Sequence, residues 1–481
     1  MDDKNNWLNG CAFLYLCIPI IIFLFGWCKL YIAIILTILL TIVFLANYKI
    51  QKMNFEKIKN ALKKNYKMLI SFFVIALFYV FLSGIGGFVW QNGDHLYRNA
   101  IFENLVNNDW PIVIDSSSGF QGPVFFVYYF AFWLPAALIG KICGIAVGNT
   151  FLYIWSVIGI FIVFLYLRTY YKKKYIVPVI LFAFFSGLDI VERFLYGADV
   201  IALINSTLHI EWTTGFQISS FTTQLFWVFN QCIPAWIITM FILKEKRNRI
   251  IGIVIAMSLI FCTLPAIGLV FIAIYKILFK DFKISWIKNN KIKVKEWFFD
   301  TFTWENIIVG IPLLVLLALF VKSNEAGDAI VLGIDNYKIL PVIVTIFFEY
   351  FIYYILIYKY QKQSPLYYIS LILLLLCSFV KIGYGGDFCM RASIPGLVAL
   401  FVMILESLSI AQEKKDKKFI IALTVLMVLG SITPLNEIKR TIANTNENTK
   451  IETIDLINDK HKRNFYGYID KSLFYKYFIK K

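Results

Sequence analysis

The sequence predicts an all-α protein, a polytopic bundle of transmembrane helices, and its composition and patterning are the reasons. Of the 481 residues, 59% are hydrophobic and 16% are charged, and the mean hydropathy is +0.71. Soluble globular domains hold apolar and charged fractions nearer a half and a quarter. Long apolar runs alternate with short basic runs, and a helix satisfies its own backbone hydrogen bonds in lipid. We expect about 11 to 15 membrane segments, two of them irregular or re-entrant hairpins, and interfacial helices in the outer loops.

The formal net charge of +17 would indicate nucleic-acid binding in a soluble protein. Here Lys and Arg gather in short runs between apolar segments, which is typical of cytoplasmic loops in a multi-pass protein of the cell membrane. We therefore expect no nucleic-acid partner. The eight cysteines lie mostly inside apolar runs and show no metal-ligand spacing. We therefore expect no structural metal and no resident cofactor.

The N-terminal apolar runs set the orientation. A bilayer core of about 30 Å needs roughly 20 apolar residues per helix. Residues 7–26 and 30–47 are expected to form a hairpin that returns to the lysine-rich stretch 49–67. This basic stretch places the N-terminus in the cytoplasm. The next helix, 68–89, then crosses outward, and the polar stretch 90–122 lies outside the cell.

Two apolar runs are expected to enter and leave the membrane on the same face. Run 123–147 must make an even number of crossings, because the basic residues that end the next helix, 149–168, would otherwise lie outside. We expect either a hairpin broken near Pro135 or an interfacial segment on the outer surface. Run 250–275 has basic residues on both sides and is expected to break near Pro265.

The remaining apolar runs each predict one crossing: 175–188, 225–243, 304–321, 338–357, 364–380, 393–411 and 419–435. The basic and aromatic stretch 280–303 predicts a cytoplasmic interfacial helix. Residues 1–435 then form the transmembrane domain, and 436–481 form an extracytoplasmic tail. The outer loops after the first are 189–224, 322–337 and 381–392.

Loop 90–122 is the candidate active loop, because polar side chains reachable by water and substrate gather in it. The cytoplasmic segments contain no GxxxxGK[ST], GxGxxG or HExxH motif. We therefore do not expect nucleotide-driven chemistry. An enzyme outside the cell lacks ATP, so its substrate must arrive activated, and a lipid-linked donor meets this need.

Asp94 is the candidate catalytic base. It follows Gly93 just past the outer end of a helix and precedes a stretch with helical apolar spacing, from His95 to Val106. A carboxylate at this depth could accept a proton from an acceptor hydroxyl. The structural alternative is that Asp94 caps that helix and pairs with Arg98 one turn later.

The other polar residues of the outer loops are candidates for substrate binding. Arg193 and Arg391 could grip a phosphate or diphosphate, because a guanidinium offers two parallel donors to phosphate oxygens. The alternative for each is an interfacial anchor or an ion pair with the neighbouring acid. Further substrate-binding candidates are His95, Arg98, Asp109, His209, Glu211 and Asp387.

Two further possibilities involve acidic residues. Asp94, His95, His209 and Glu211 have the chemistry to hold a divalent ion, but their spacing does not define a ligand set. Glu349 lies inside an apolar run, where a charge costs about 2.5 to 3.5 kcal/mol, so it is expected to face the bundle interior or a cavity.

An outward helix is followed by a loop with Asp94 near its start. An apolar segment begins at Gly122-Pro123 and reaches Leu138–Gly144, and a helix then ends in the basic run Arg168–Lys174. In this arrangement, residues 68–245 resemble the GT-C type of membrane glycosyltransferase. This resemblance implies that the sugar donor is a membrane lipid, a polyprenyl-phosphate sugar. Its sugar would be transferred to an extracytoplasmic acceptor.

The same resemblance implies a mechanism. The acceptor hydroxyl, deprotonated by Asp94, would attack C1 of the sugar, and the stereochemistry at C1 would be inverted. Arg391 or Arg193 would hold the departing polyprenyl phosphate.

Two other functions fit the sequence. One is a flippase for lipid-linked oligosaccharides or another transporter, in which the broken hairpins line a path and Glu349 is an intramembrane coupling group. The other is a polymerase or ligase of cell-surface polysaccharides, which would use outer-loop arginines on a diphosphate-linked donor. Sugar transfer without lipid movement would distinguish the enzyme from the transporter.

Overall fold

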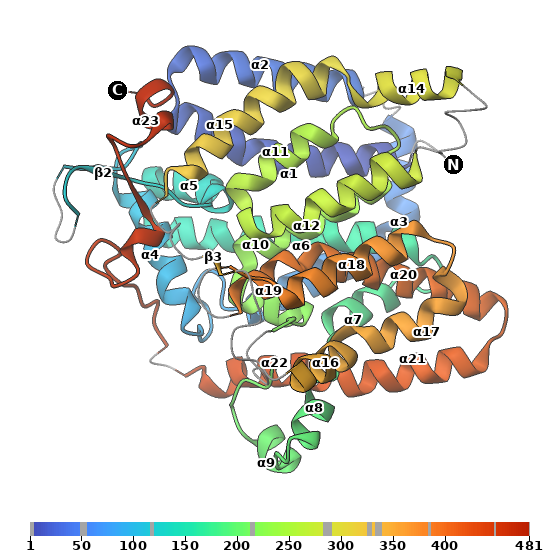
Figure 1. The fold of residues 1–481 in the computed structure, drawn as a ribbon. Helices are drawn as coiled ribbons and strands as arrows, with labels where there is room; N and C mark the ends of the chain where they lie inside the picture. The colour runs from blue at the N-terminus through green and yellow to red at the C-terminus, as the bar shows by residue number, and fades with distance from the viewer. Residues whose placement is uncertain are drawn as a thin grey trace.

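The computed structural model of the chain is a helical bundle with small antiparallel strands at one end (Figure 1). It describes residues 4–48, 55–115, 120–211, 217–281, 291–324, 330–331, 339–382, 386–446 and 449–480. The predicted outer loop 322–337 lies mostly outside the described residues. Parts of the predicted loops 90–122, 189–224 and 381–392 and of the interfacial stretch 280–303 lie outside them as well.

Ten helices of the described chain are long and apolar enough to cross a membrane, which confirms the predicted polytopic all-α bundle. Several are built from consecutive α- and π-helical parts. They lie within α1 (Lys4–Trp27), α2 (Leu30–Asn47), α3 (Phe55–Leu82), α6 (Ile145–Tyr170), α10 (Phe221–Lys244), α12 with η2 (Thr263–Ile274, Tyr275–Lys280), α14 with η3 and α15 (Lys291–Thr301, Glu305–Gly310, Ile311–Lys322), α16 with η4 and α17 (Ile339–Ile346, Phe347–Phe351, Ile352–Gln361), α20 (Ile394–Glu413), and α21 with α22 (Lys417–Gly430, Ile432–Asn444).

The other elements are short. The α-helices among them are α4 (Asp94–Asn107), α5 (Leu134–Cys143), α7 (Val177–Ala183), α8 (Asp189–Leu195), α9 (Val200–Asn205), α11 (Ile251–Phe261), α18 (Pro365–Phe379), α19 (Asp387–Ala392) and α23 (Leu473–Tyr477). Two 3-10 turns are η1 (Ala131–Trp133) and η5 (Lys462–Asn464). Helices α4, α8, α9 and α19 lie in the predicted outer loops.

Two small antiparallel sheets complete the fold. In the first, β2 (Val124–Phe126) lies between β1 (Val113–Ile114) and β5 (Tyr466–Tyr468), with Phe125 opposite both Val113 and Gly467. In the second, β3 (Ile330–Val331) pairs with β4 (Lys381–Ile382).

Both runs that were predicted to be irregular are interrupted, but in 123–147 the turn between helices lies at Gly144 and not near Pro135. Run 123–147 forms β2, η1 and the ten-residue α5, and then turns into α6 at Gly144, whose φ is 90°. Pro135 begins α5, at a position where a missing backbone N–H costs nothing. Run 250–275 forms α11 and α12, with the break at Cys262 (φ −157°, ψ 71°). The break precedes the predicted Pro265, because that proline is accommodated in the first turn of α12.

Two predicted boundaries differ from the structure. Run 175–188 contains only the seven-residue helix α7, because the chain leaves the helix at Phe184 and Leu188 donates a backbone hydrogen bond to Phe348 instead. At the other boundary, α22 continues to Asn444, beyond the predicted start of the tail at 436. The remaining tail packs on the bundle through β5 and α23.

The basic runs gather at one end of the bundle, which we call the basic end. Asn9 of α1 donates to Glu245 after α10 (2.8 Å), Lys280 donates to Leu243 (2.8 Å), and Lys359 pairs with Asp416 (2.7 Å). The opposite end, which we call the α4 end, holds α4, β2, α23 and α19 (Figure 1). There the backbone of Lys29 binds Phe478, so the tail closes on the α1–α2 turn.

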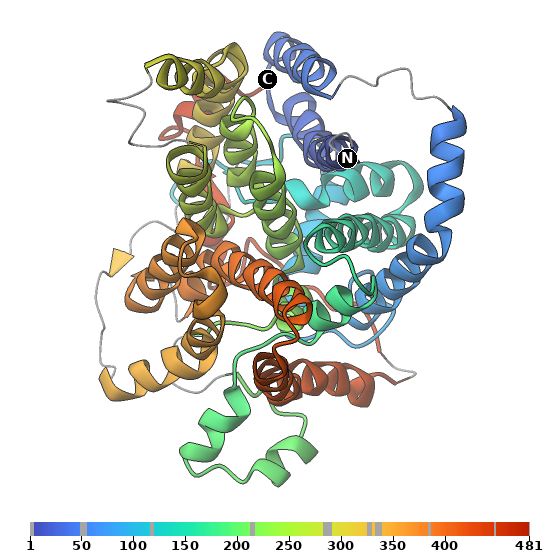
Figure 2. The same cartoon turned by 90° about the vertical axis from the view of Figure 1, so that its right-hand side faces the viewer.

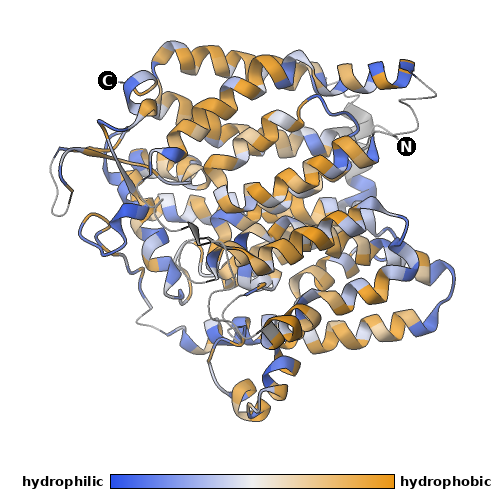
Figure 3. Cartoon of the chain, in the orientation of Figure 1, coloured by the Kyte–Doolittle hydropathy of each residue, from blue (hydrophilic) through white to orange (hydrophobic). Residues whose placement is uncertain are grey.

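Helix α10 is the centre of the bundle and is buried along nearly its whole length. Its Phe221 and Trp236 pack with Phe182 and Phe401, with ring centroids 4.2 to 5.7 Å apart. At the periphery, α3 stands apart from most of the bundle (Figure 2), and in its second half large apolar side chains such as Phe73 and Phe78 are exposed, as lipid contact requires. Hydrophobic residues predominate along the long helices of the bundle (Figure 3).

Candidate functional site

The candidate site begins at a break in α10. Val228 has non-helical torsion angles (φ −135°, ψ 38°). This break interrupts the helical hydrogen-bond pattern, so the backbone carbonyls of the residues just before Val228 can accept from other donors. The start of α4 supplies their donors: His95 Nε2 lies 3.0 Å from the Phe226 carbonyl, and Arg98 Nε lies 2.6 Å from the Trp227 carbonyl. Burial, together with the Arg98 charge, lowers the pKa of His95 to about 4, so the imidazole is neutral. His95 and Arg98 therefore join α4 to the broken segment of α10.

Asp94 lies at the mouth of this junction. Its carboxylate forms an ion pair with Arg98 at 2.7 Å, and its side chain is 38% exposed whereas that of Arg98 is 4% exposed. The Asp94 backbone N–H donates to the Asn92 side chain, so Asn92 supplies the polar bond at the start of α4. The predicted pairing with Arg98 is thus present, and it fixes a carboxylate that still faces solvent.

Arg391 approaches the same region from α19. Its Nη1 donates to Asp387 at 3.1 Å, and the two side chains are 12% and 43% exposed. Burial lowers the pKa of Arg391, but the charge of Asp387, with smaller contributions that include Tyr128, Tyr129 and Asp94, raises it above its usual range. The Arg391 Nε is buried and has no hydrogen-bond acceptor among the described residues. We call Asp94, Arg98, Tyr128, Tyr129 and Arg391 the α4–α19 site.

Asp109 does not belong to the α4–α19 site. It lies past the far end of α4, and a helix of 14 residues is about 21 Å long. Its side chain is exposed. The sequence brought Asp109 and Asp94 into one loop, but the helix between them keeps them apart.

His209 and Glu211 lie in a separate buried network at the start of α10. His209 Nδ1 is 2.7 Å from Glu437, and its Nε2 is 3.7 Å from Glu211. Glu211 accepts hydrogen bonds from the Ser220 backbone (3.0 Å) and the Thr223 hydroxyl (2.6 Å). Burial raises the pKa of Glu211 to about 7. These contacts make Glu211 an anchor for the first turn of α10, and solvent does not reach it.

Glu437 and Arg440 complete this network and were not among the predicted residues. Glu437 accepts from the Trp227 indole at 2.9 Å and from Arg440 at 2.8 Å. The Arg440 guanidinium also lies over the rings of Trp90 and Trp227, 5.8 and 5.6 Å from their centroids. The amphipathic spacing of the residues after 432 could have indicated a helix with a buried polar face. Because the hydropathy falls there, the segment was instead predicted to begin the tail.

Arg193 has a local partner. Its Nε donates to the Ile210 carbonyl at 2.9 Å and so closes the segment that contains α8 and α9. This segment projects from the bundle in both views (Figures 1 and 2). Asp94 is an electrostatic neighbour of Arg391, so Arg391 is the phosphate-binding candidate that the structure places beside it.

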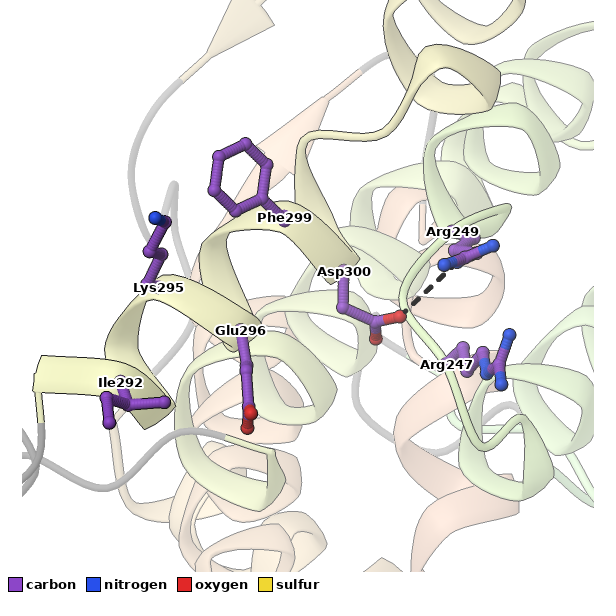
Figure 4. A pocket seen from close by; sticks show the side chains of 7 residues that line it. All are labelled: Arg247, Arg249, Ile292, Lys295, Glu296, Phe299 and Asp300. Carbon is purple, nitrogen blue, oxygen red and sulfur yellow. Dashed lines mark ion pairs between the residues drawn. The ribbon is translucent and has the colours of Figure 1, made fainter.

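A cleft of about 550 Å³ lies at the basic end, away from the α4–α19 site (Figure 4). It opens between α14 and the segment after α10. Arg249 faces Asp300 across it, with Nε 3.6 Å from the carboxylate oxygen. Its lining residues are Arg247, Arg249, Ile292, Lys295, Glu296, Phe299 and Asp300. This cleft has no contact with the predicted catalytic residue.

The four residues considered for a divalent ion do not share one site. His95 binds the broken segment of α10, and His209 lies between Glu211 and Glu437. Within the ranges that the structure describes, no three His, Cys, Asp or Glu side chains form a group that could hold a metal ion.

The comparisons with known proteins identify no relative. No protein-family model, curated protein or solved structure matches the chain.

Proposed function

We propose that the chain is a membrane glycosyltransferase that moves a sugar from a polyprenyl-phosphate donor to an extracytoplasmic acceptor. The observation that carries the proposal is the α4–α19 site. There a solvent-facing carboxylate (Asp94) lies within electrostatic reach of a largely buried guanidinium (Arg391) whose Nε has no acceptor in the described chain. A base and a phosphate-binding cation are the two groups that this transfer requires.

The orientation follows from charge. Since Lys and Arg are retained on the cytoplasmic side, the basic end and the N-terminus face the cytoplasm. The α4 end, with the α4–α19 site and the tail, then faces outward, where no nucleotide is present and a lipid-linked sugar is the activated substrate.

In the proposed reaction, Asp94 accepts the proton of the acceptor hydroxyl while the acceptor oxygen forms a bond to C1 of the sugar. The bond from C1 to the phosphate oxygen breaks, and its electron pair leaves with the polyprenyl phosphate. Arg391 stabilises that oxygen with its guanidinium. Attack opposite the leaving group inverts C1. Arg98 positions Asp94 through their ion pair at 2.7 Å.

The test is sugar transfer in proteoliposomes with a labelled polyprenyl-phosphate sugar. Asp94→Asn keeps the size of the side chain and removes the base, and we expect a loss of about a hundredfold or more in the transfer rate. Asp109→Asn is the matched control, because Asp109 is an exposed acid at the other end of α4. Full transfer by Asp94→Asn would refute the assignment of the base.

A second candidate function is a transporter or flippase of lipid-linked sugars. It is favoured by one observation, the burial of Glu349 (3% exposed) inside the bundle next to Asp189. Purified protein that moves labelled lipid across the bilayer and transfers no sugar would support it. Transfer only from a diphosphate-linked donor would instead indicate a polymerase or ligase.

A further inference from the structure

Two buried carboxyl groups lie close together inside the bundle, and neither is part of the α4–α19 site. Asp189 begins α8 and is 1% exposed, and Glu349 lies in the π-helical turn η4 and is 3% exposed. Gly187 makes their approach possible, because a Cβ there would collide with the carboxyl group and the backbone of Glu349. π-helical turns occur frequently at functional sites.

The hydrogen bonds around the pair are incomplete. Asp189 Oδ2 accepts from the hydroxyls of Ser186 (3.1 Å) and Thr433 (2.8 Å). Asp189 Oδ1 and Glu349 Oε2 are buried and receive no hydrogen bond from any donor in the described chain. The Asp189 carboxyl group is an electrostatic neighbour of Glu349, and a Cβ on Gly187, two residues before Asp189, would overlap Glu349 Oε2. A proton on one of the two groups would supply a donor for these oxygens, because two carboxylates are both acceptors.

The other titratable groups around the pair add no positive charge. Glu192 of α8 and Glu211 contribute further negative charge, and Glu192 accepts from the Thr345 hydroxyl of α16. The Tyr353 hydroxyl donates to the Ser186 carbonyl at 2.9 Å. Cys389 of α19 and Tyr350 also lie nearby. No ion pair with Lys, Arg or His reaches Asp189 or Glu349 in the part of the chain that the structure describes.

We propose that Asp189 and Glu349 form a buried proton-binding site that holds one shared proton at neutral pH. One carboxyl group is protonated and donates to the other, which stays ionised. Two adjacent carboxylates in an apolar interior cannot both ionise without strong repulsion. The shared proton joins α8 to η4, so its release would drive these elements apart.

This inference does not depend on the proposed transferase. A transporter could couple the site to movement, whereas in a transferase the site would hold the outer segment 189–211 against the bundle. Either way, the pair and its proton are properties of the folded chain, and they are measurable without a substrate.

The test is infrared spectroscopy of the purified full chain at pH 8, where the C=O stretch reports protonated carboxyl groups. We expect the difference spectrum between wild type and Glu349→Gln to show the loss of one protonated carboxyl per chain. The subtraction removes the signal of Glu211, which both proteins contain. Glu413→Gln is the matched control, because Glu413 is an exposed carboxylate, and we expect no change in the band.

Asp189→Asn tests the pair from the other side. Glu349 then loses the carboxylate that accepts its proton, and we expect the C=O band to shift or disappear. Thermal unfolding shows whether each variant is folded before its spectrum is recorded. If the spectra of Glu349→Gln and Asp189→Asn are both identical to that of the wild type, the proposal is overturned. Stabilisation of the wild type by sodium, with no protonated band, would also overturn it, because a cation would then occupy the site.

Discussion

Removing the Glu437 carboxylate is the sharpest test of how the candidate site is supported. Glu437 is 4% exposed in its side chain and accepts hydrogen bonds from three residues: His209 at 2.7 Å, Arg440 at 2.8 and 3.0 Å, and the Trp227 indole at 2.9 Å. The variant Glu437→Ala takes the acceptor from all three donors at once, and it leaves the nearly buried Arg440 guanidinium (12% exposed) without its carboxylate.

The magnitude follows from the burial of these groups. Hydrogen bonds to charged groups contribute about 1.5 to 3 kcal/mol each, but the three donors act as one network and their contributions do not add. Removing one partner of a buried ion pair lowers the free energy of unfolding by roughly 3 to 5 kcal/mol. We therefore expect Glu437→Ala to lower the free energy of unfolding by about 4 kcal/mol, nearly a thousandfold in the unfolding equilibrium.

Thermal unfolding read with a thiol-reactive dye measures this loss, because six cysteines are buried in the folded chain: Cys17, Cys28, Cys232, Cys262, Cys377 and Cys389. Glu452→Ala is the matched control, since Glu452 is exposed on the tail. Equal unfolding temperatures for Glu437→Ala and Glu452→Ala would refute the reasoning. The double variant with Arg440→Ala should cost less than the sum of the single variants, because both remove the same pair.

Three further predictions test other parts of the structure. Arg391→Lys keeps the positive charge but loses the Nε donor and the planar guanidinium, which offers two parallel N–H donors to a phosphate. The KM for the lipid donor should therefore rise roughly tenfold or more, while kcat falls less. Glu211 has a pKa of about 7 in the folded chain against about 4.3 unfolded, so its protonation stabilises the fold most below pH 4.3, and this contribution is lost as the pH rises through 7. From pH 4.3 to pH 7, the free energy of unfolding of the wild type should therefore fall by about 3 kcal/mol relative to that of Glu211→Gln in the same unfolding assay. A difference between the two proteins that does not change over this pH range would contradict the prediction. Gly187→Ala should destabilise the fold by about 1 to 3 kcal/mol, because its Cβ meets Glu349, whereas Gly93→Ala meets no atom within 4 Å and should have little effect.

Much of the bundle could be predicted because bilayer crossing leaves a strong signal in the sequence. A charge in the apolar core is costly, so the run lengths and the basic ends locate the helices. The break in 250–275 was predicted from basic residues on both sides of the run, Arg249 before it and lysines after it. Residues 175–188 were misjudged because an apolar run does not distinguish a full crossing from a short buried helix such as α7.

The supporting contacts could not be predicted, because they join residues far apart in the chain. The break at Val228 has no Gly or Pro beside it, and the polar groups of α4 that compensate it lie more than a hundred residues earlier. Glu349 was expected to face the interior, and it is buried. Its neighbour Asp189 was not foreseen, since nothing in the local pattern of either segment refers to the other.

Trp227 explains why these separate contacts act on one site. Its backbone carbonyl accepts from Arg98, which holds Asp94, and its indole donates to Glu437, which holds His209 and Arg440. A helix that continued without a break at Val228 would use that carbonyl within its own hydrogen-bond pattern, and Arg98 would have no acceptor there. The irregularity of α10 is therefore what allows α4 to dock, and the docking of α4 sets where the Asp94 carboxylate faces solvent. The position of the proposed base thus depends on a buried helix and on α22 as much as on the polar loop that contains it.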